Sequence, residues 1–516
     1  MDATTLTVDS PLPDDVPTLQ ALVRQLLAEV ARLRGQLDAA LRHRFGRRSE
    51  RRIPPAQKKG EPKKAAPHGR SVLHEHLKRR EVVHDLSEGQ KLCPCCGLPR
   101  VCIGEQTAEQ LEVQPAVFYV LRTVKKTYAC QRCDPQQVPA ERRIQTAGPE
   151  QVGPIAKGPC GPGLLAHVIT AKFADHTPLH RLAGQLARSG VVVARSTLGD
   201  WLAAAADLLG PSCLLMRQRS LHSRVIHSDD TKVKLRVVGA SQTKKAHLWV
   251  YVGDADSPYV VFDFTADYTA EGPERFLRDY KGYLQADALA RYEGLFGPGK
   301  VEHCCCWAHA RRKFVAAGEG GDERARTAVE LIGKLYAIER ELPPLLPPSD
   351  DPVAQQQRLA RQEQRQQMRQ RQARPILDEL KKWLDGQKPR ALPKSALGQA
   401  ISYALNNWAA LERYLEKGHL AIDNNLSERT LRAIALGRNN WVVIGSEAGG
   451  RTAAVLYTVV LTCKHLGIDP FAYLRETLMG LFALGERPTA EQLSAWLPDR
   501  WLLRRTQQAA PEAAAG

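Results

Sequence analysis

Three carboxylates in this chain stand in contexts where they can hold metal ions. Asp229 lies in the segment VIHSDDT, Asp287 in YLQADALARY and Glu428 in IDNNLSERTLR. Mg²⁺ prefers carboxylate oxygens together with water and substrate phosphate, and a pair of such ions can clamp a phosphodiester during in-line displacement. The residue types therefore indicate phosphoryl-transfer chemistry on two Mg²⁺ or Mn²⁺ ions, provided that the fold brings the three side chains together.

Five predicted strands must position the first two carboxylates. Beyond Ser223 the apolar residues alternate or form short runs, and an amphipathic segment falls between the third and fourth runs. This order predicts a ribonuclease H-like, mixed five-stranded sheet with helices, in which the ends of the first and fourth strands bring Asp229 towards Asp287. The five strand segments are SRVIHSDD, HLWVYVGD, YVVFDF, GYLQAD and VEHCCCW.

A predicted helix must supply Glu428. Asp423 is the expected N-cap of this helix. Asn424, Glu428 and Arg432 follow at intervals of four residues and share one helical face. A carboxylate on that face can reach ions at the edge of the sheet, while Arg429 or Arg432 meets phosphate.

Strand alternation bears on two neighbouring features. Asp230 adjoins Asp229, and only one of the two can face the metal ions because successive strand residues point to opposite faces. The pattern alone does not say whether Asp229 or Asp230 faces the ions. The same alternation disfavours a second metal site built from Cys304–Cys306 with His303 and His309, so we expect these cysteines in the core.

Two Cys-x-x-Cys pairs predict a structural zinc site. Cys93 and Cys96 form the first pair, and Cys130 and Cys133 form the second after 33 intervening residues. Each pair can aim two thiolates at one point, and two pairs complete the tetrahedral shell of Zn²⁺. Cys95 competes with Cys96 for the ligand role, and no feature of the module makes the zinc catalytic.

The charge of the chain favours a polyanionic partner. A net charge of +17 over 516 residues is clustered, with 14 Lys and Arg against three acidic residues between positions 42 and 80. This Pro-rich stretch can lie along DNA phosphates or serve only as a solvated linker. Arginines near the motifs above are further candidates for DNA contact. The candidates are Arg47, Arg48, Arg311, Arg312, Arg429 and Arg432.

Two helical patterns precede the predicted sheet. One apolar stripe suits a short coiled coil and self-association, or equally packing on the chain itself. Residues 178–189 and 196–209 form a helical pair that is either a DNA-reading helix-turn-helix or plain packing. With no secretory signal or membrane-length apolar run, we expect a cytoplasmic, nucleoid-associated protein with metal-bound or free thiols. The stripe comprises Leu19, Leu22, Leu26, Val30, Leu33, Leu37 and Leu41.

From about residue 19 to residue 501 the chain resembles transposases of the insertion sequence 66 family. IDNNLSER and CWAHARRKF are the most diagnostic of the shared segments. The resemblance implies that the family's DDE triad falls on Asp229, Asp287 and Glu428, and it favours Asp229 over Asp230. It also implies a zinc finger, a leucine zipper and two smaller accessory proteins. The other shared segments are RFGRRSE, CPCCG, CQRC, HSDDT, GYLQADALARY, TLRAIALGRNNWVVIGSEAGG, GIDPFAYLRETL and WLPDRW.

The predicted fold class is multidomain α/β. A ribonuclease H-like catalytic domain is interrupted by a helical insertion and follows a coiled-coil-like helix, a small zinc-binding module and a helical DNA-binding region. The expected segments are a disordered tail (1–15), a zipper-like helix (16–45), a basic flexible linker (46–85), the zinc module (86–140), the helix-turn-helix-like region (150–215), the catalytic domain (220–320 and 401–446), its insertion (321–400) and a C-terminal helical region (447–516).

The function expected from these features is DNA transposition. A metal-dependent transposase would cut the ends of its element and join the freed 3′-hydroxyl to target DNA as a dimer or higher oligomer. Two rivals remain: a nuclease of the same fold that hydrolyses without joining, and a zinc-finger DNA-binding regulator whose catalytic domain is idle.

Overall fold

The structure, a computed structural model, describes most of the chain beyond residue 160. The described residues are 15–27, 30, 118–120, 127–129, 136, 144–146, 153–155, 160–237, 239, 241–297 and 299–513. The chain divides into two compact units, residues 47–120 and the remainder. The predicted zinc ligands Cys93, Cys96, Cys130 and Cys133, the alternative ligand Cys95 and the DNA-contact candidates Arg47 and Arg48 lie outside the described residues. So do Leu33, Leu37 and Leu41 of the apolar stripe.

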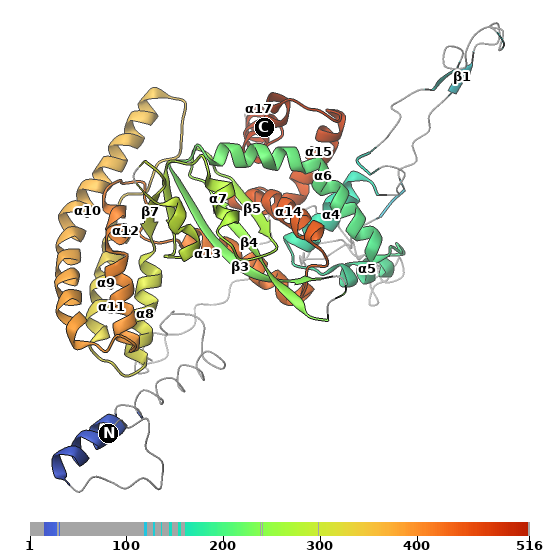
Figure 1. Cartoon of the computed structure of the whole chain (residues 1–516). Helices are drawn as coiled ribbons and strands as arrows, with labels where there is room; N and C mark the ends of the chain where they lie inside the picture. Colours follow the sequence, from blue (N-terminus) through green and yellow to red (C-terminus); the bar gives the residue numbers. More distant parts are fainter. Residues whose placement is uncertain are drawn as a thin grey trace, which may run out of the picture. The chain divides into compact units, whose positions relative to one another are not determined.

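A five-stranded mixed sheet forms the centre of the described part of the chain (Figure 1). Its strand order is β5-β4-β3-β6-β7; β3 pairs antiparallel with β4 and parallel with β6, and β7 is parallel to β6. The predicted mixed five-stranded sheet is confirmed. Its strands are β3 (Val225–Arg236), β4 (Thr243–Val252), β5 (Val260–Thr265), β6 (Tyr283–Ala286) and β7 (Glu302–Cys305), and a separate pair is β1 (Thr127–Ala129) with β2 (Ile144–Thr146).

Strand β3 is longer than the sequence pattern predicted. The expected strand ended at Asp230, but β3 continues to Arg236 because Val233 and Leu235 alternate with exposed lysines in a second half-buried stretch. Parallel pairing with β6 ends at His227. The remainder of β3 pairs with β4, and Leu235 also forms a bridge with Ile444. Asp229 therefore lies inside a strand, just beyond the end of β6, rather than at a strand terminus.

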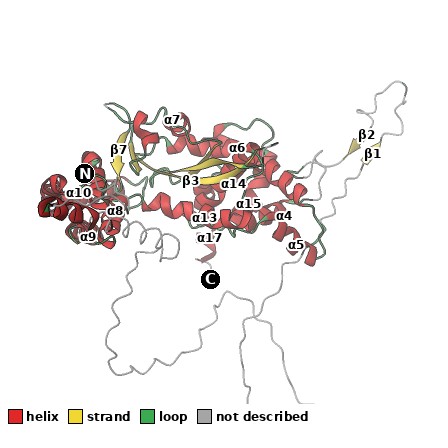
Figure 2. Ribbon diagram, turned by 60° about the horizontal axis from the view of Figure 1, so that its bottom comes forward, coloured by secondary structure: helices red, strands yellow, loops and turns green. Residues whose placement is uncertain are grey.

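Helices surround the sheet. Figure 2 shows α7 and α13 on opposite sides of it. The helices are α4 (Pro162–Phe173), α5 (Leu179–Arg188), α6 (Arg195–Ser220), α7 (Glu271–Leu277), α8 (Trp307–Glu319), α9 (Ala325–Glu341), α10 (Pro352–Gln387), α11 (Ala396–Asn406), α12 (Trp408–Glu412), α13 (Asn425–Trp441), α14 (Glu447–His465), α15 (Pro470–Ala483), α16 (Ala490–Ser494) and α17 (Pro498–Ala513), with 3₁₀ turns at Ala290–Leu295, Lys388–Arg390 and Arg413–Leu415.

Helix α14 packs along β5, the strand at one edge of the sheet. The hydroxyls of Thr458 and Thr462 accept the backbone N–H groups of Phe262 and Val260 at 2.9 and 3.0 Å. These bonds satisfy donors that an edge strand would otherwise expose. On the sheet itself, α13 packs against β3 and β4, and this contact carries Glu428 towards the strands.

The helical insertion is joined to the sheet by a continuous core that includes Cys304, Trp307 and residues of α9 to α12. Within the Gln- and Arg-rich part of α10, Arg369 is fully buried. Its guanidinium pairs with Glu339 and donates to the carbonyls of Tyr414, Lys417 and Leu420, so every donor finds an acceptor. This network fixes the segment that leads into α13.

Two of the helix boundaries differ from the predictions. The helix after Gly190 runs from Arg195 to Ser220 instead of ending near Leu209, and it continues through Pro211. Helix α13 has Asn424 rather than Asp423 as its N-cap residue. Residues 16–27 are helical, in keeping with the apolar stripe. Among the described residues, no helix combines the length and apolarity that a bilayer crossing requires.

Candidate active site

The three carboxylates of interest come from three elements that meet near the end of β6, at the middle of the sheet. Asp229 lies within β3, Asp287 directly follows β6, and Glu428 lies in the first turn of α13. Strands β3 and β6 are neighbours, and α13 packs on β3. The structure thus brings together residues that are far apart in the sequence.

The carboxyl group of Asp229 is surrounded by other acids. Its pKa is raised to about 7, first by burial and then by the negative charges of Asp230, Glu428 and Asp287. Burial is the main cause of the shift, and the like charges of the neighbouring acids add to it because they disfavour ionisation. A divalent cation would relieve that repulsion, and oxygen donors of this kind suit a hard ion. The residues present therefore fit such a metal.

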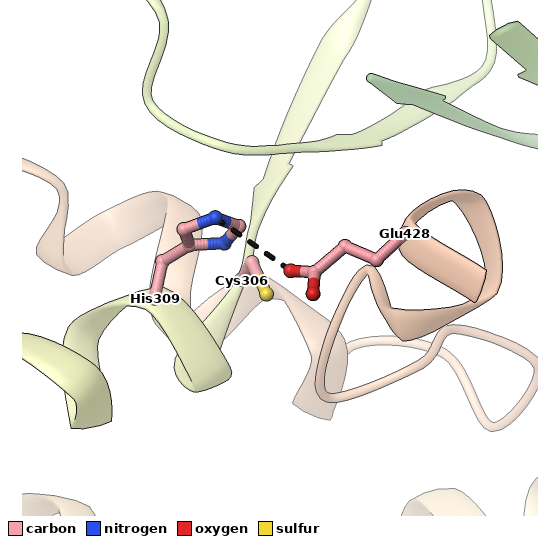
Figure 3. A group of neighbouring side chains, drawn as sticks. All are labelled: Cys306, His309 and Glu428. Atoms are coloured by element: carbon pink, nitrogen blue, oxygen red, sulfur yellow. Dashed lines mark ion pairs between the residues drawn. The ribbon is translucent and has the colours of Figure 1, made fainter. Parts of the chain in front are cut away.

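His309 lies between two of the carboxylates. Its Nε2 is 3.5 Å from Oδ2 of Asp287 and 3.6 Å from Oε1 of Glu428. The separation of the two carboxylate oxygens therefore cannot exceed the sum of these two distances. Figure 3 shows the imidazole facing Glu428, with Cys306 beside them. His309 lies in the first turn of α8, directly after β7. Burial lowers the pKa of its imidazole, which favours the neutral form.

Cys306 completes a group whose potential metal-binding atoms lie within 4.8 Å of one another, together with His309 and Glu428. Its Sγ, however, accepts the backbone N–H of Asn424 at 3.2 Å, and burial raises the pKa of the thiol to about 12. A protonated thiol is a poor metal ligand. The core position predicted for Cys304–Cys306 is confirmed, because all three side chains are buried.

Glu428 is held by an arginine. Both of its carboxylate oxygens accept from Nη2 of Arg312, at 2.5 and 2.7 Å. Arg312 was predicted to contact DNA, but in this structure it contacts the third carboxylate. The neighbouring candidates Arg429 and Arg432 are exposed on α13, and Arg311 is half-buried on α8.

Asp230 turns to the other face of β3. Its Oδ2 accepts from Nδ1 of the buried His247 at 2.5 Å, and the Tyr268 hydroxyl donates to its Oδ1 at 3.4 Å. The rings of His247 and Tyr268 stack with centroids 4.0 Å apart. Asp229, whose Oδ1 accepts the backbone N–H of Asp230 at 2.8 Å, is the one of the pair that faces the other acids.

A buried asparagine links α13, β3 and the corner between β7 and α8. Asn424 is fully buried; its Nδ2 donates to the carbonyl of Ser228 at 2.8 Å, and its Oδ1 lies 3.2 Å from Nδ1 of His227. Its backbone N–H reaches Cys306, and its carbonyl accepts from the amide of Glu428 at 3.3 Å. Asn424 therefore fixes the start of α13 against β3 beside Asp229 and against the β7–α8 corner beside His309.

Sequence reasoning missed two contacts in this neighbourhood. The hydroxyl of Tyr403, on α11, donates to Oδ1 of Asp287 at 2.5 Å. Asn424 was placed on the same helical face as Glu428, but its buried network was not foreseen. No local pattern marks Tyr403, whose partner lies 116 positions away.

Comparisons with known proteins point to one family. Residues 157–452 match the family described as Transposase IS66 family, and residues 90–134 match the zinc-finger binding domain of transposase IS66. A Sinorhizobium fredii protein described as uncharacterized protein y4jD is 31% identical over 536 residues, covering 97% of this chain and 99% of the relative. Uncharacterized protein y4hP of the same organism is 29% identical over 449 residues, covering 82% and 75%. With more than half of its residues matched, this chain belongs to the IS66 family of transposases.

Proposed function

We propose that this transposase cuts DNA at the ends of its insertion element and transfers the resulting 3′-hydroxyl into target DNA, using divalent cations held by Asp229, Asp287 and Glu428. The observation that carries the proposal is the meeting of these carboxylates from three separate elements. The order and directions of the five strands support a ribonuclease H-like catalytic domain of the DDE type.

Two bound Mg²⁺ or Mn²⁺ ions would supply Lewis-acid activation of the attacking oxygen and neutralise charge on the leaving oxygen. The side chains of the chain orient the reactants around them. A neutral His309 adds no positive charge between Asp287 and Glu428, so it does not compete with the ions. Arg312 can leave Glu428 and turn to a phosphate, because guanidinium pairs with either anion.

DNA recognition is assigned to the basic residues around this site and to the N-terminal modules. Exposed Arg429 and Arg432 lie on the helix of Glu428, and Arg311 lies one residue before Arg312 on α8. Arg47 and Arg48 would contact DNA phosphates that are farther from the cleaved bond. The family match over residues 90–134 supports a structural Zn²⁺, for which we propose four ligands: Cys93, Cys96, Cys130 and Cys133.

The transposase would act as a dimer or higher oligomer that holds two element ends, with accessory proteins of the same element as possible partners. Its substrate, chromosomal DNA, would place it in the cytoplasm at the nucleoid. Self-association through residues 16–45 is part of this proposal, since the helix at residues 16–27 leaves Leu19 and Leu26 exposed.

The test is a reaction of purified protein with DNA that carries an element end, a target plasmid and Mg²⁺. The parent should give nicked ends and joined product, and Glu428→Ala should give neither while still binding the DNA. Nicks without joined product would point to the nuclease alternative. A parent that binds DNA but never cuts it would point to the regulator alternative.

A further inference from the structure

A tyrosine of the helical insertion reaches the acidic cluster. Tyr403 lies on α11, and its hydroxyl donates to Oδ1 of Asp287 at 2.5 Å. The same hydroxyl lies 3.6 Å from Sγ of the buried Cys305, and Nζ of Lys313 lies 4.6 Å from the centroid of the ring. The half-buried phenol is thus held between α8 and β7, with its polar end directed at the carboxylate.

The two oxygens of Asp287 have different surroundings. Oδ1 accepts from the Tyr403 hydroxyl and, at 2.7 Å, from the backbone N–H of Ala288. These two donors use both lone pairs of that oxygen. Oδ2 instead lies 3.5 Å from Nε2 of His309, on the side where Glu428 also approaches. The oxygen that remains for a cation is therefore Oδ2.

We infer that Tyr403 is a positioning residue that fixes Asp287 so that it binds a divalent cation through Oδ2 alone. This inference rests on the proposed function, because it takes Asp287 as a metal ligand. Binding through a single oxygen suits Mg²⁺, which keeps near-octahedral geometry and needs its other positions for water and substrate phosphate. The helical insertion then contributes to the metal site itself and is more than a spacer between Asp287 and Glu428.

The experiment measures Mn²⁺ binding to the full chain by electron paramagnetic resonance, for the parent, Tyr403→Phe and Asp287→Asn. Tyr403→Phe keeps the packed ring and removes only the donor. Loss of an outer-shell partner weakens metal affinity by about 10- to 100-fold, so we expect a loss of about tenfold. DNA cleavage by this variant should recover when Mn²⁺ is raised by about the same factor, which a purely structural defect would not allow.

Tyr336→Phe is the matched control. Tyr336 lies on α9 of the same insertion, and its hydroxyl donates at 3.0 Å to Asp423, which is not a proposed ligand. Its removal should leave Mn²⁺ affinity unchanged. Thermal unfolding of each variant gives the temperature below which binding is measured on folded protein.

Three results would overturn the inference. If Tyr403→Phe binds Mn²⁺ as tightly as the parent while Asp287→Asn binds it more weakly, Tyr403 has no positioning role and the proposed function stands. If Asp287→Asn and the parent bind alike, Asp287 is not a ligand, and both the inference and the proposed function are wrong. A defect of Tyr403→Phe that added Mn²⁺ does not restore also counts against the positioning role.

Discussion

The sheet side and the helix side of the site hold their carboxylates by different means. Asp287, at the end of β6, accepts from two neutral donors, the hydroxyl of Tyr403 and a backbone amide. Glu428, on α13, is paired through both oxygens with the cationic Arg312. Neutral donors leave the negative charge available to a cation, whereas a guanidinium neutralises it. In the proposed metal site, the sheet side would therefore receive an ion directly, whereas Glu428 on the helix side would first have to release Arg312.

Helix α8 connects the two sides. It carries His309, which faces both Asp287 and Glu428, and three residues later it carries Arg312. Residues three apart lie on one helical face, so a single helix presents a neutral and a charged group to the same cluster. We expect DNA phosphate to draw Arg312 away from Glu428, which would couple substrate binding to metal binding on the helix side.

The largest effect is expected from removing a carboxylate from either side. Asp287→Asn and Glu428→Gln should each lower the rate of DNA cleavage by more than about a hundredfold, since even outer-shell changes cost about 10- to 100-fold. A cleavage assay on end-labelled DNA measures the rates. If the two sides form one catalytic site, both variants must lose DNA cleavage. An Asp287→Asn or Glu428→Gln variant that still cleaves DNA would show that its side is not part of that site.

Asn424→Ala should destabilise the protein, because Asn424 links α13 to β3. Removing the amide leaves the carbonyl of Ser228 buried without its donor, which costs about 1–3 kcal/mol of unfolding free energy. Denaturant titration measures the loss, with Asn439→Ala, an exposed position on the same helix, as the control. Equal stability of the two variants would show that the buried network does not fasten α13 to β3.

Asp229→Asn should stabilise the metal-free protein at neutral to alkaline pH. The folded-state pKa of Asp229 is raised to about 7 from 3.8, so between these values the folded chain keeps a proton that the unfolded chain has lost. Stability therefore falls as pH rises through this window and is unaffected below it. The variant escapes this loss and should be more stable at pH 8 by about 1 kcal/mol after allowance for partial exposure.

Melting temperatures recorded across this pH window provide the check. If the difference in melting temperature between the parent and Asp229→Asn stays the same at all pH values, the pKa of Asp229 is not raised in the folded chain. Added Mn²⁺ should reverse the order, because the ion binds the ionised parent and competes with the proton.

The smallest effect is expected from Arg312→Gln. Its pair with Glu428 is partly exposed, and such pairs contribute about 0.2–1 kcal/mol. Without the competing cation, DNA-free protein should bind Mn²⁺ up to about fivefold more tightly. Weaker Mn²⁺ binding by the variant would instead mean that Arg312 supports the metal site, and the contrast between the two sides would disappear.

Local patterns were sufficient to predict the sheet and the helix of Glu428, whereas the choice of Asp229 over Asp230 came from the family resemblance. Alternation and apolar runs identified the five strands in their order, and the spacing in IDNNLSER placed Glu428 on a helix. The length of β3 was missed because Lys232 and Lys234, exposed on one face, masked the buried Val233 and Leu235. The period-two pattern was present, but it followed two aspartates that resembled a strand end.

The polar contacts that surround these acids and anchor the insertion could not be predicted. The burial of Arg369 in a Gln- and Arg-rich stretch depends on Glu339 and on three carbonyls of a later segment. The contact of Tyr403 with Asp287 and the pairing of Arg312 with Glu428 likewise arise only from tertiary packing. The local sequence pattern around a residue does not reveal a partner that is distant in the sequence. The polar contacts around the site therefore became known only from the structure.

Anomalous diffraction from crystals of the full chain grown with Mn²⁺ and a cleaved DNA end would locate the ions directly. We expect two peaks roughly 3.5–4 Å apart, bound jointly by Asp229, Asp287 and Glu428, with Oδ2 of Asp287 as its only ligating atom and Arg312 turned away. Peaks elsewhere, or ions that leave any one of these three carboxylates without a bond, would contradict a shared catalytic metal site.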